Sequence, residues 1–218
     1  MAETIIGRNA VLEALKGNRE IEKITLAKGA EGSVKQIAAK ARDKHIPIYY
    51  SDKARMDKAA SGGAHQGVIA QVAAYEYSTV EDILEKAREK GEAPFVFLLD
   101  DIEDPHNLGA IIRTANLAGA HGVIIPKRHA VGLTSTVAKT SAGALNYTPV
   151  AKVSNLGQTI EELKKEGMWF VCADMGGELM YNLNLTGPMG VVIGNEGEGV
   201  SRLVKEKCDF AAAIPMKG

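Results

Sequence analysis

The sequence is poor in cysteine and in aromatic residues, and it has no long apolar run. Cys172 and Cys208 are too few and too far apart to indicate a zinc site or a disulfide framework. No apolar run approaches the roughly 18 residues of a membrane-spanning helix. The amino terminus, MAETIIGRNA, lacks the basic and then apolar pattern of a signal peptide. We therefore expect a cytoplasmic protein with reduced thiols, without a membrane segment and without a metal site.

Acidic residues are missing from one long stretch of the chain. The net charge of −1 says nothing about partners, but residues 105–160 contain no Asp or Glu. The cations there are Arg113, Lys127, Arg128, Lys139 and Lys152. A region of one sign is typical of an anionic partner such as nucleic acid, although chance can give the same pattern in an ordinary helical hairpin.

The central stretch is residues 95–126. An apolar run over 95–99 ends at Asp100 and Asp101, which predicts a strand buried on both faces. A polar turn over 104–109, a helix over 108–118 and a strand over 122–125 should follow. In such folds ligands bind beyond the carboxyl end of the strand. This places Asn107, a donor and acceptor, and Arg113, a cationic fork suited to phosphate, near a site.

The chain is predicted to be an α/β protein with two domains. Residues 1–75 form a small α/β unit, with helices over 9–15 and 34–44, strands over 21–27, 46–50 and 66–74, and a short helix capped by Ser51-Asp52. Residues 76–93 are acidic and predict a solvated linker helix, capped by Ser78 or Thr79 and ended by Gly91.

Residues 94–218 alternate between strands and helices, which predicts a mostly parallel sheet covered on both faces. The expected strands are 95–99, 122–125, 149–153, 168–173, 189–194 and 210–214. The expected helices are 108–118, 134–142, 156–166 and 199–206, with a polar loop over 174–188.

Two further segments have the composition of ligand-binding turns. Gly194-Asn-Glu196-Gly197-Glu198-Gly199 follows an apolar run, and its glycines leave amide groups free to face a ligand. Ile214-Pro215-Met216 ends a strand with a residue that cannot continue the ladder. Taken alone, each segment also fits a plain turn or the end of an edge strand.

Together these segments carry a resemblance to a family. Residues 107–115 resemble the first motif of the SpoU (TrmH-like) RNA ribose methyltransferases, residues 194–199 the second, and residues 214–218 the start of the third. The whole chain most resembles the bacterial subgroup that methylates a guanosine of large-subunit ribosomal RNA. The resemblance implies a SPOUT fold with a carboxyl-terminal trefoil knot, a homodimer, and an amino-terminal RNA-binding domain whose His65-Gln66-Gly67 is either an RNA contact or only a turn.

The resemblance also implies the roles of individual residues. Asn107, Arg113 and Glu196 would be catalytic, S-adenosyl-L-methionine would lie at Gly194, Ile214 and Met216, and RNA would contact Arg113, Lys127 and Arg128. Because a guanidinium is never deprotonated in proteins, we expect Arg113 to stabilise alkoxide charge and grip a phosphate. Asn107 would position Arg113 or the ribose. Alternatively, Arg113 is a buried ion-pair partner of Asp100, Asp101 or Asp104.

The third motif of the resembled family continues into a Ser-Leu-Asn segment and a helix, whereas this sequence ends at Gly218. We therefore expect a fragment or a truncated chain that binds the cofactor poorly. Two other functions fit the same residues: methylation of transfer RNA, and RNA binding without catalysis.

Overall fold

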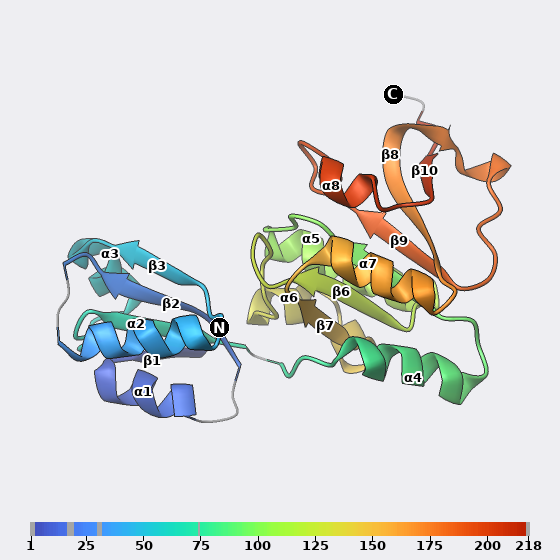
Figure 1. Ribbon diagram of the computed structural model, residues 1–218. Helices are drawn as coiled ribbons and strands as arrows, with labels where there is room; N and C mark the ends of the chain where they lie inside the picture. The colour runs from blue at the N-terminus through green and yellow to red at the C-terminus, as the bar shows by residue number, and fades with distance from the viewer. Residues whose placement is uncertain (1–2, 17–19, 30–31, 74, 217–218) are drawn as a thin grey trace. The chain divides into compact units, whose positions relative to one another are not determined.

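The computed structural model describes residues 3–16, 20–29, 32–73 and 75–216. The chain divides into two compact units, residues 1–76 with 132–135, and residues 77–131 with 136–218 (Figure 1). Each unit is built on its own sheet. Among the described helices, none is long and apolar enough to cross a membrane.

The amino-terminal unit contains a four-stranded sheet in the order β1-β4-β2-β3. Strands β2 and β3 are parallel, and β4 runs antiparallel to β1 and β2. Its elements are β1 (Glu3–Ile6), α1 (Arg8–Lys16), β2 (Ile21–Ala27), α2 (Ser33–Asp43), β3 (Ile48–Ser51), α3 (Lys53–Ala59) and β4 (Val68–Val72). The predicted α/β unit is confirmed, and β1 is an addition.

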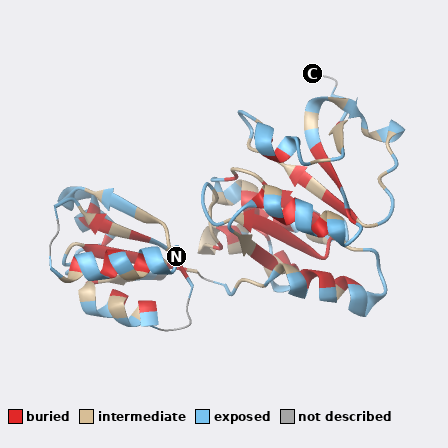
Figure 2. Cartoon of the chain, in the orientation of Figure 1, coloured by how far each residue is buried: buried red, intermediate tan, exposed pale blue. Residues whose placement is uncertain are grey.

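Strand alternation gives the two faces of this sheet different partners. Ile24 and Leu26 of β2 lie in a core with Val11 of α1 and Ile37 of α2. On the opposite face, Ile69 of β4 packs with Met56 and Ala60, and this contact covers only part of the sheet. Figure 2 shows buried positions alternating with exposed ones along these elements.

The carboxyl-terminal unit contains a six-stranded, wholly parallel sheet in the order β10-β8-β9-β5-β6-β7. The strands are β5 (Phe95–Leu99), β6 (Gly122–Pro126), β7 (Val150–Val153), β8 (Trp169–Leu179), β9 (Met189–Ile193) and β10 (Phe210–Ala213). The helices are α4 (Val80–Lys90), α5 (Pro105–Leu117), α6 (Ser135–Thr140), α7 (Leu156–Lys165) and α8 (Arg202–Lys205), with the 3₁₀ turns η1 (Ala144–Asn146) and η2 (Met180–Asn182). The predicted parallel α/β architecture is confirmed, while the trefoil knot stays a prediction.

Three boundaries in this unit were predicted wrongly. The helix expected over 199–206 begins only at Arg202. The segment expected as a polar loop over 174–188 begins as a continuation of β8 to Leu179, because β10 pairs with β8 in two registers, before and after a shift between Ala211 and Ala212. The segment expected as a turn over 104–109 is the first turn of α5, which starts at Pro105. A proline at the first position of a helix has no amide that needs a partner, so it favours this start.

Helix α4 belongs to the carboxyl-terminal unit, so the interpretation of residues 76–93 as a solvated linker helix is wrong. Ile83, Leu84 and Ala87 form its buried face and pack into the core of the parallel sheet. Thr79 caps the helix: its hydroxyl accepts from the Asp82 N–H at 3.1 Å, and its own N–H donates to the Asp82 carboxylate at 2.7 Å. That backbone hydrogen bond lowers the pKa of Asp82.

Removal of the Thr79 hydroxyl should destabilise the carboxyl-terminal unit. The variant Thr79→Ala loses the acceptor for a helix N–H, so we expect the free energy of unfolding to fall by about 1 kcal/mol. Urea unfolding followed by circular dichroism measures it. The neighbouring Ser78→Ala is the matched control and should change little, since Thr79 is the residue that caps α4. Equal losses in both variants would contradict the assignment of the cap.

Candidate active site

Helix α5 is fixed at its amino terminus by Asp104. The Asp104 carboxylate accepts from the His106 N–H at 2.6 Å and from the Asn107 N–H at 3.0 Å. Asn107 therefore lies in the first turn of a capped helix, beyond the carboxyl end of β5. The cap satisfies two helix amides that would otherwise lack partners. The side chain of Asn107 is thus presented from a rigid element at the edge of the sheet.

The loop after β9 is organised by Asn195, which the sequence analysis did not select. Its side-chain oxygen accepts from the N–H groups of Gly197 at 2.9 Å and Glu198 at 2.7 Å. Its amide nitrogen donates to Asp101 at 2.8 Å, which ties the loop to the end of β5. An Asn whose side chain bonds the backbone two residues later is a common turn-forming device, and this was the available signal.

Gly194 is required by close backbone packing in the same loop. A Cβ atom at this position would lie 2.0 Å from the carbonyl carbon of Gly199 and 2.2 Å from the nitrogen of Val200. No side chain fits between the backbone of Gly194 and the backbone of residues 199–200. The residue therefore sets how tightly the chain turns back after β9.

The structure joins the first and second motifs by a side-chain hydrogen bond. The Asn107 amide donates to the Glu196 carboxylate. Both residues line a cavity of about 270 Å³, together with Asp101, Ile102, Glu103, Asp104, Asn195 and Gly197. Because Glu196 holds the Asn107 amide, the expectation that Asn107 positions Arg113 is not supported. The two predicted catalytic residues that meet are Asn107 and Glu196.

A second, larger cavity of about 1050 Å³ adjoins the first at the carboxyl edge of the sheet. Residues that follow β5, β6, β7 and β9 line it, including Asp100, Arg128, Asn155 and Asn195. Asp101 and Asn195 line both cavities. The Asp100 carboxylate accepts from the Ser201 N–H at 2.8 Å, and this bond joins the end of β5 to the start of α8. The edge predicted to bind ligands is therefore hollowed and lined with polar groups.

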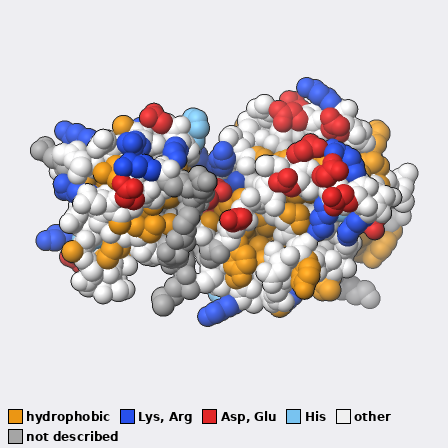
Figure 3. Space-filling view, turned by 90° about the horizontal axis from the view of Figure 1, so that it is seen from below, with side chains coloured by type: hydrophobic (Ala, Val, Ile, Leu, Met, Phe, Trp, Pro, Cys, Tyr) orange, Lys and Arg blue, Asp and Glu red, His pale blue; other side chains and the backbone are white. Residues whose placement is uncertain are grey.

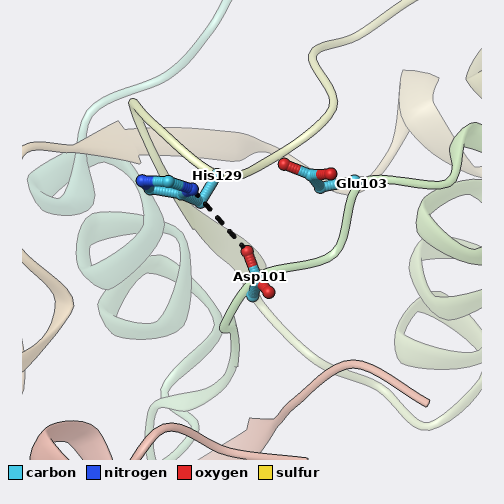
Figure 4. A group of neighbouring side chains, drawn as sticks. All are labelled: Asp101, Glu103 and His129. Carbon is cyan, nitrogen blue, oxygen red and sulfur yellow. Dashed lines mark ion pairs between the residues drawn. The ribbon is translucent and has the colours of Figure 1, made fainter. Parts of the chain in front are cut away.

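Two carboxylates and one imidazole come together beside these cavities. Ligand atoms of Asp101, Glu103 and His129 lie within 4.8 Å of one another (Figure 4). His129 Nδ1 is 4.0 Å from Asp101 Oδ1, and its side chain is 79% exposed. The second Asp101 oxygen is the acceptor for Asn195. The group can bind a cation, but its geometry also fits an exposed contact between His129 and Asp101 that helps to hold the Asp101 side chain in place.

Arg113 lies apart from Asn107 and Glu196. It is exposed on α5, so the alternative of a buried ion pair with Asp100, Asp101 or Asp104 is wrong. Six residues along a helix correspond to about 9 Å of rise and about 240° of rotation, so Arg113 and Asn107 point to different sides. Neither described cavity includes Arg113 in its lining.

The remaining predicted site residues are exposed at the edges of the same unit. Ile214 and Met216 follow β10 and are 65% and 76% exposed. Lys127 and Arg128 follow β6 and are exposed, and Arg128 lines the larger cavity. Strands β9 and β10 flank β8 and run parallel to it, so Gly194, Ile214 and Met216 lie toward the carboxyl edge of the sheet.

His65 and the two cysteines are structural. His65 is buried, accepts from the Gly67 N–H at its Nδ1, and contacts Asp57 through Nε2 at 2.9 Å. These bonds favour the turn interpretation of His65 over a direct RNA contact. Cys172 and Cys208 are free and pack in or against the core. Burial raises the pKa of the Cys208 thiol to about 12, which disfavours a reactive thiolate.

Family models match both parts of the chain. The model described as "SpoU rRNA Methylase family" matches residues 94–218, and the model described as "RNA 2'-O ribose methyltransferase substrate binding" matches residues 4–78. A putative TrmH family tRNA/rRNA methyltransferase of Bacillus subtilis is 49% identical over 216 residues, which are 98% of this chain and 86% of the relative. A putative TrmH family tRNA/rRNA methyltransferase of Staphylococcus haemolyticus is 43% identical over the same shares of the two chains.

Solved structures share the fold. An AdoMet-bound rRNA methyltransferase from Sinorhizobium meliloti aligns with a TM-score of 0.58 and 23% identity, over 99% of this chain and 78% of the other. A SpoU methyltransferase from Streptomyces viridochromogenes in complex with AdoMet aligns with a TM-score of 0.58 and 21% identity, over 99% of this chain and 81% of the other.

Proposed function

Because this chain belongs to the SpoU rRNA Methylase family, we propose that it transfers a methyl group from S-adenosyl-L-methionine to the ribose 2′-hydroxyl of a guanosine in large-subunit ribosomal RNA. The observation that carries the proposal is the hydrogen bond between Asn107 and Glu196. It brings two motifs, far apart in sequence, to one cavity at the carboxyl edge of a parallel sheet. We also propose a cytoplasmic location, where such a substrate occurs.

The residues present fit the methyl donor. Gly194 allows a backbone turn that any Cβ would block, and the exposed Ile214 and Met216 follow a strand that ends at the same edge. The two strands are separated only by β8, which corresponds to about 10 Å at the usual spacing of strands. We propose that Gly194, Ile214 and Met216 hold the adenosyl group, with the Met216 thioether against its face.

The donor supplies an electrophilic methyl group, and the protein must orient the hydroxyl that attacks it. Glu196 engages one carboxylate oxygen with Asn107, and its other oxygen can accept a hydrogen bond from the 2′-hydroxyl and take its proton as the oxygen attacks the methyl group. Asn107 keeps the carboxylate in place from the capped first turn of α5. These two residues position the nucleophile. The alkoxide charge that develops requires a cation, which is the role proposed for Arg113.

Arg113 does not line the Glu196 cavity of its own chain. The proposed homodimer resolves this, because the partner's Arg113 can complete each site. Several large apolar side chains of the carboxyl-terminal unit that the cofactor does not need are exposed and are available to an interface: Leu117, Met175, Tyr181 and Leu203. Lys127 and Arg128 would contact the phosphates of the RNA.

The test is labelled methyl transfer to purified transcripts. We expect incorporation into large-subunit ribosomal RNA and little into transfer RNA under the same conditions. The Glu196→Gln variant is the control, since it keeps the size of the side chain but loses the carboxylate charge. Preferential labelling of transfer RNA would assign the chain to the other substrate of this family, and binding of RNA without labelling would indicate a non-catalytic protein.

A further inference from the structure

The amino-terminal sheet has one face that its helices cover only in part. Paired residues of neighbouring strands lie on the same face, and the register pairs Thr25 with Tyr49 and Lys23 with Gln71. These residues alternate with Ile24 and Leu26, which face α1 and α2. Lys23 and Tyr49 therefore lie on the face that α3 covers through Met56 and Ala60. Both remain exposed, and Tyr49 is 55% exposed.

Tyr49 and Lys23 form a pair suited to a nucleotide. The Lys23 ammonium lies 5.7 Å from the centroid of the Tyr49 ring, within the range of a cation–π contact. The ammonium lies over the face of this exposed ring, so a base that stacks on Tyr49 takes its place and the flexible Lys23 side chain turns to the phosphate. An unpaired base can stack on such a ring while the ammonium neutralises the adjoining phosphate.

Further cations lie where β2 and β3 end. Lys28 lies there, since its N–H donates to the Ser51 carbonyl at 3.0 Å. Helix α3 begins directly after β3 and carries Lys53 and Arg55, the latter with its side chain 84% exposed. The adjacent carboxylate of Asp52 caps α3 by accepting from the Arg55 N–H at 2.9 Å, and it also forms an exposed ion pair with Arg55 Nε at 3.5 Å, which a phosphate would have to replace. Figure 3 shows Lys and Arg side chains on the surface of this unit, with some Asp and Glu side chains beside them.

We propose that this face is a stacking platform for single-stranded RNA, with an unpaired base on Tyr49 and the flanking phosphates on Lys23 and the cations of α3. The occupant is a looped-out segment of the RNA substrate, because a base inside a duplex has no free face to offer the ring. The inference rests on the proposed function only for the choice of RNA as the partner. It assigns Tyr49 a role in binding, separate from methyl transfer.

The variant Tyr49→Ala tests the platform directly. We expect its affinity for an unstructured single-stranded fragment of ribosomal RNA to fall about 5- to 150-fold, the range for one stacked base. Filter binding with the full chain and without S-adenosyl-L-methionine measures it. Tyr49→Phe should bind as the wild type does, since stacking needs the ring and not the hydroxyl.

Tyr50 provides the matched control. It is the next residue on β3, is 56% exposed, and pairs with Leu26 on the opposite face. Tyr50→Ala should bind RNA within about twofold of the wild type. Equal affinities of Tyr49→Ala and Tyr50→Ala would overturn the proposal.

Lys23→Gln provides a second test that does not depend on the tyrosine variants. Loss of one phosphate contact lowers the slope of log affinity against log salt by about one. An unchanged slope would also overturn the proposal.

Failure of this inference can be told apart from failure of the proposed function. If Tyr49→Ala weakens RNA binding while the wild type transfers no methyl group, the platform stands and the catalytic proposal falls. If the wild type methylates ribosomal RNA and Tyr49→Ala binds RNA normally, the catalytic proposal stands and the platform falls.

Discussion

Arg113→Ala and Glu196→Ala should each lower methyl transfer about 100- to 1,000-fold, the usual cost of losing one group that stabilises developing charge or orients the nucleophile. Arg113→Ala should leave the affinity for S-adenosyl-L-methionine nearly unchanged, because the proposed partners of Arg113 are the alkoxide oxygen and a phosphate of the RNA and not the adenosyl group. Single-turnover rates and equilibrium binding of the methyl donor separate the two effects. Survival of turnover in Arg113→Ala would remove Arg113 from the mechanism.

Mixed dimers of these two variants test whether the arginine acts across the interface. In a mixed dimer one site combines an intact Glu196 with the partner's intact Arg113, whereas the other site lacks both. Random exchange between two-fold symmetric dimers should therefore restore about a quarter of the wild-type rate. Absence of restoration, with mixed dimers shown to form, would place both residues in a site of one chain. Arg113→Lys is a useful control, since it keeps the charge but loses the planar fork.

Gly194→Ala should disrupt the loop after β9. Its Cβ would overlap the backbone of Gly199 and Val200, which cannot move aside as a flexible side chain can. We expect the free energy of unfolding to fall by about 3 kcal/mol or more, the upper range for overpacking. Affinity for S-adenosyl-L-methionine should fall by more than about tenfold at any temperature where the variant is folded. Thermal unfolding and equilibrium binding measure the two quantities.

Gly197→Ala is the stability control in the same loop. A Cβ there would meet only the side-chain oxygen of Asn195 at 3.6 Å, an ordinary contact. We expect its unfolding free energy to stay within about 0.5 kcal/mol of the wild type. If Gly194→Ala were as stable as Gly197→Ala, the loop would not be packed as the structure has it.

The parallel sheet and the edge that carries the candidate site could be predicted from the sequence, because strands buried on both faces have continuous apolar runs. The apolar runs over 95–99 and 189–193 have few alternatives, and polar residues directly after them mark the ligand-binding edge. The start of α5 was misplaced because Asp104-Pro105 is both a turn signal and a helix start. Only the capping bonds to His106 and Asn107 decide between the two.

The contacts between distant residues could not be predicted in the same way. The bond from Asn195 to Asp101 and the bond from Asn107 to Glu196 depend on which strands become neighbours, and the order β9-β5 is set by the whole sheet. The sequence left two places open for Arg113, the site and a buried ion pair, because a cation in an apolar helix fits both. Helix α4 was assigned to a linker because its many charged residues outweighed three apolar residues at helical spacing, Ile83, Leu84 and Ala87.

The chemical position of the transferred methyl group tests the central claim most directly. Alkaline hydrolysis cleaves RNA through attack by the 2′-hydroxyl, so a methyl group on that oxygen protects the following phosphodiester. After reaction with labelled S-adenosyl-L-methionine, large-subunit ribosomal RNA should yield the label in an alkali-resistant dinucleotide whose first nucleoside is guanosine. Label recovered in mononucleotides, as base methylation would give, or no label at all, would contradict a site in which Asn107, Glu196 and Arg113 act on a ribose hydroxyl.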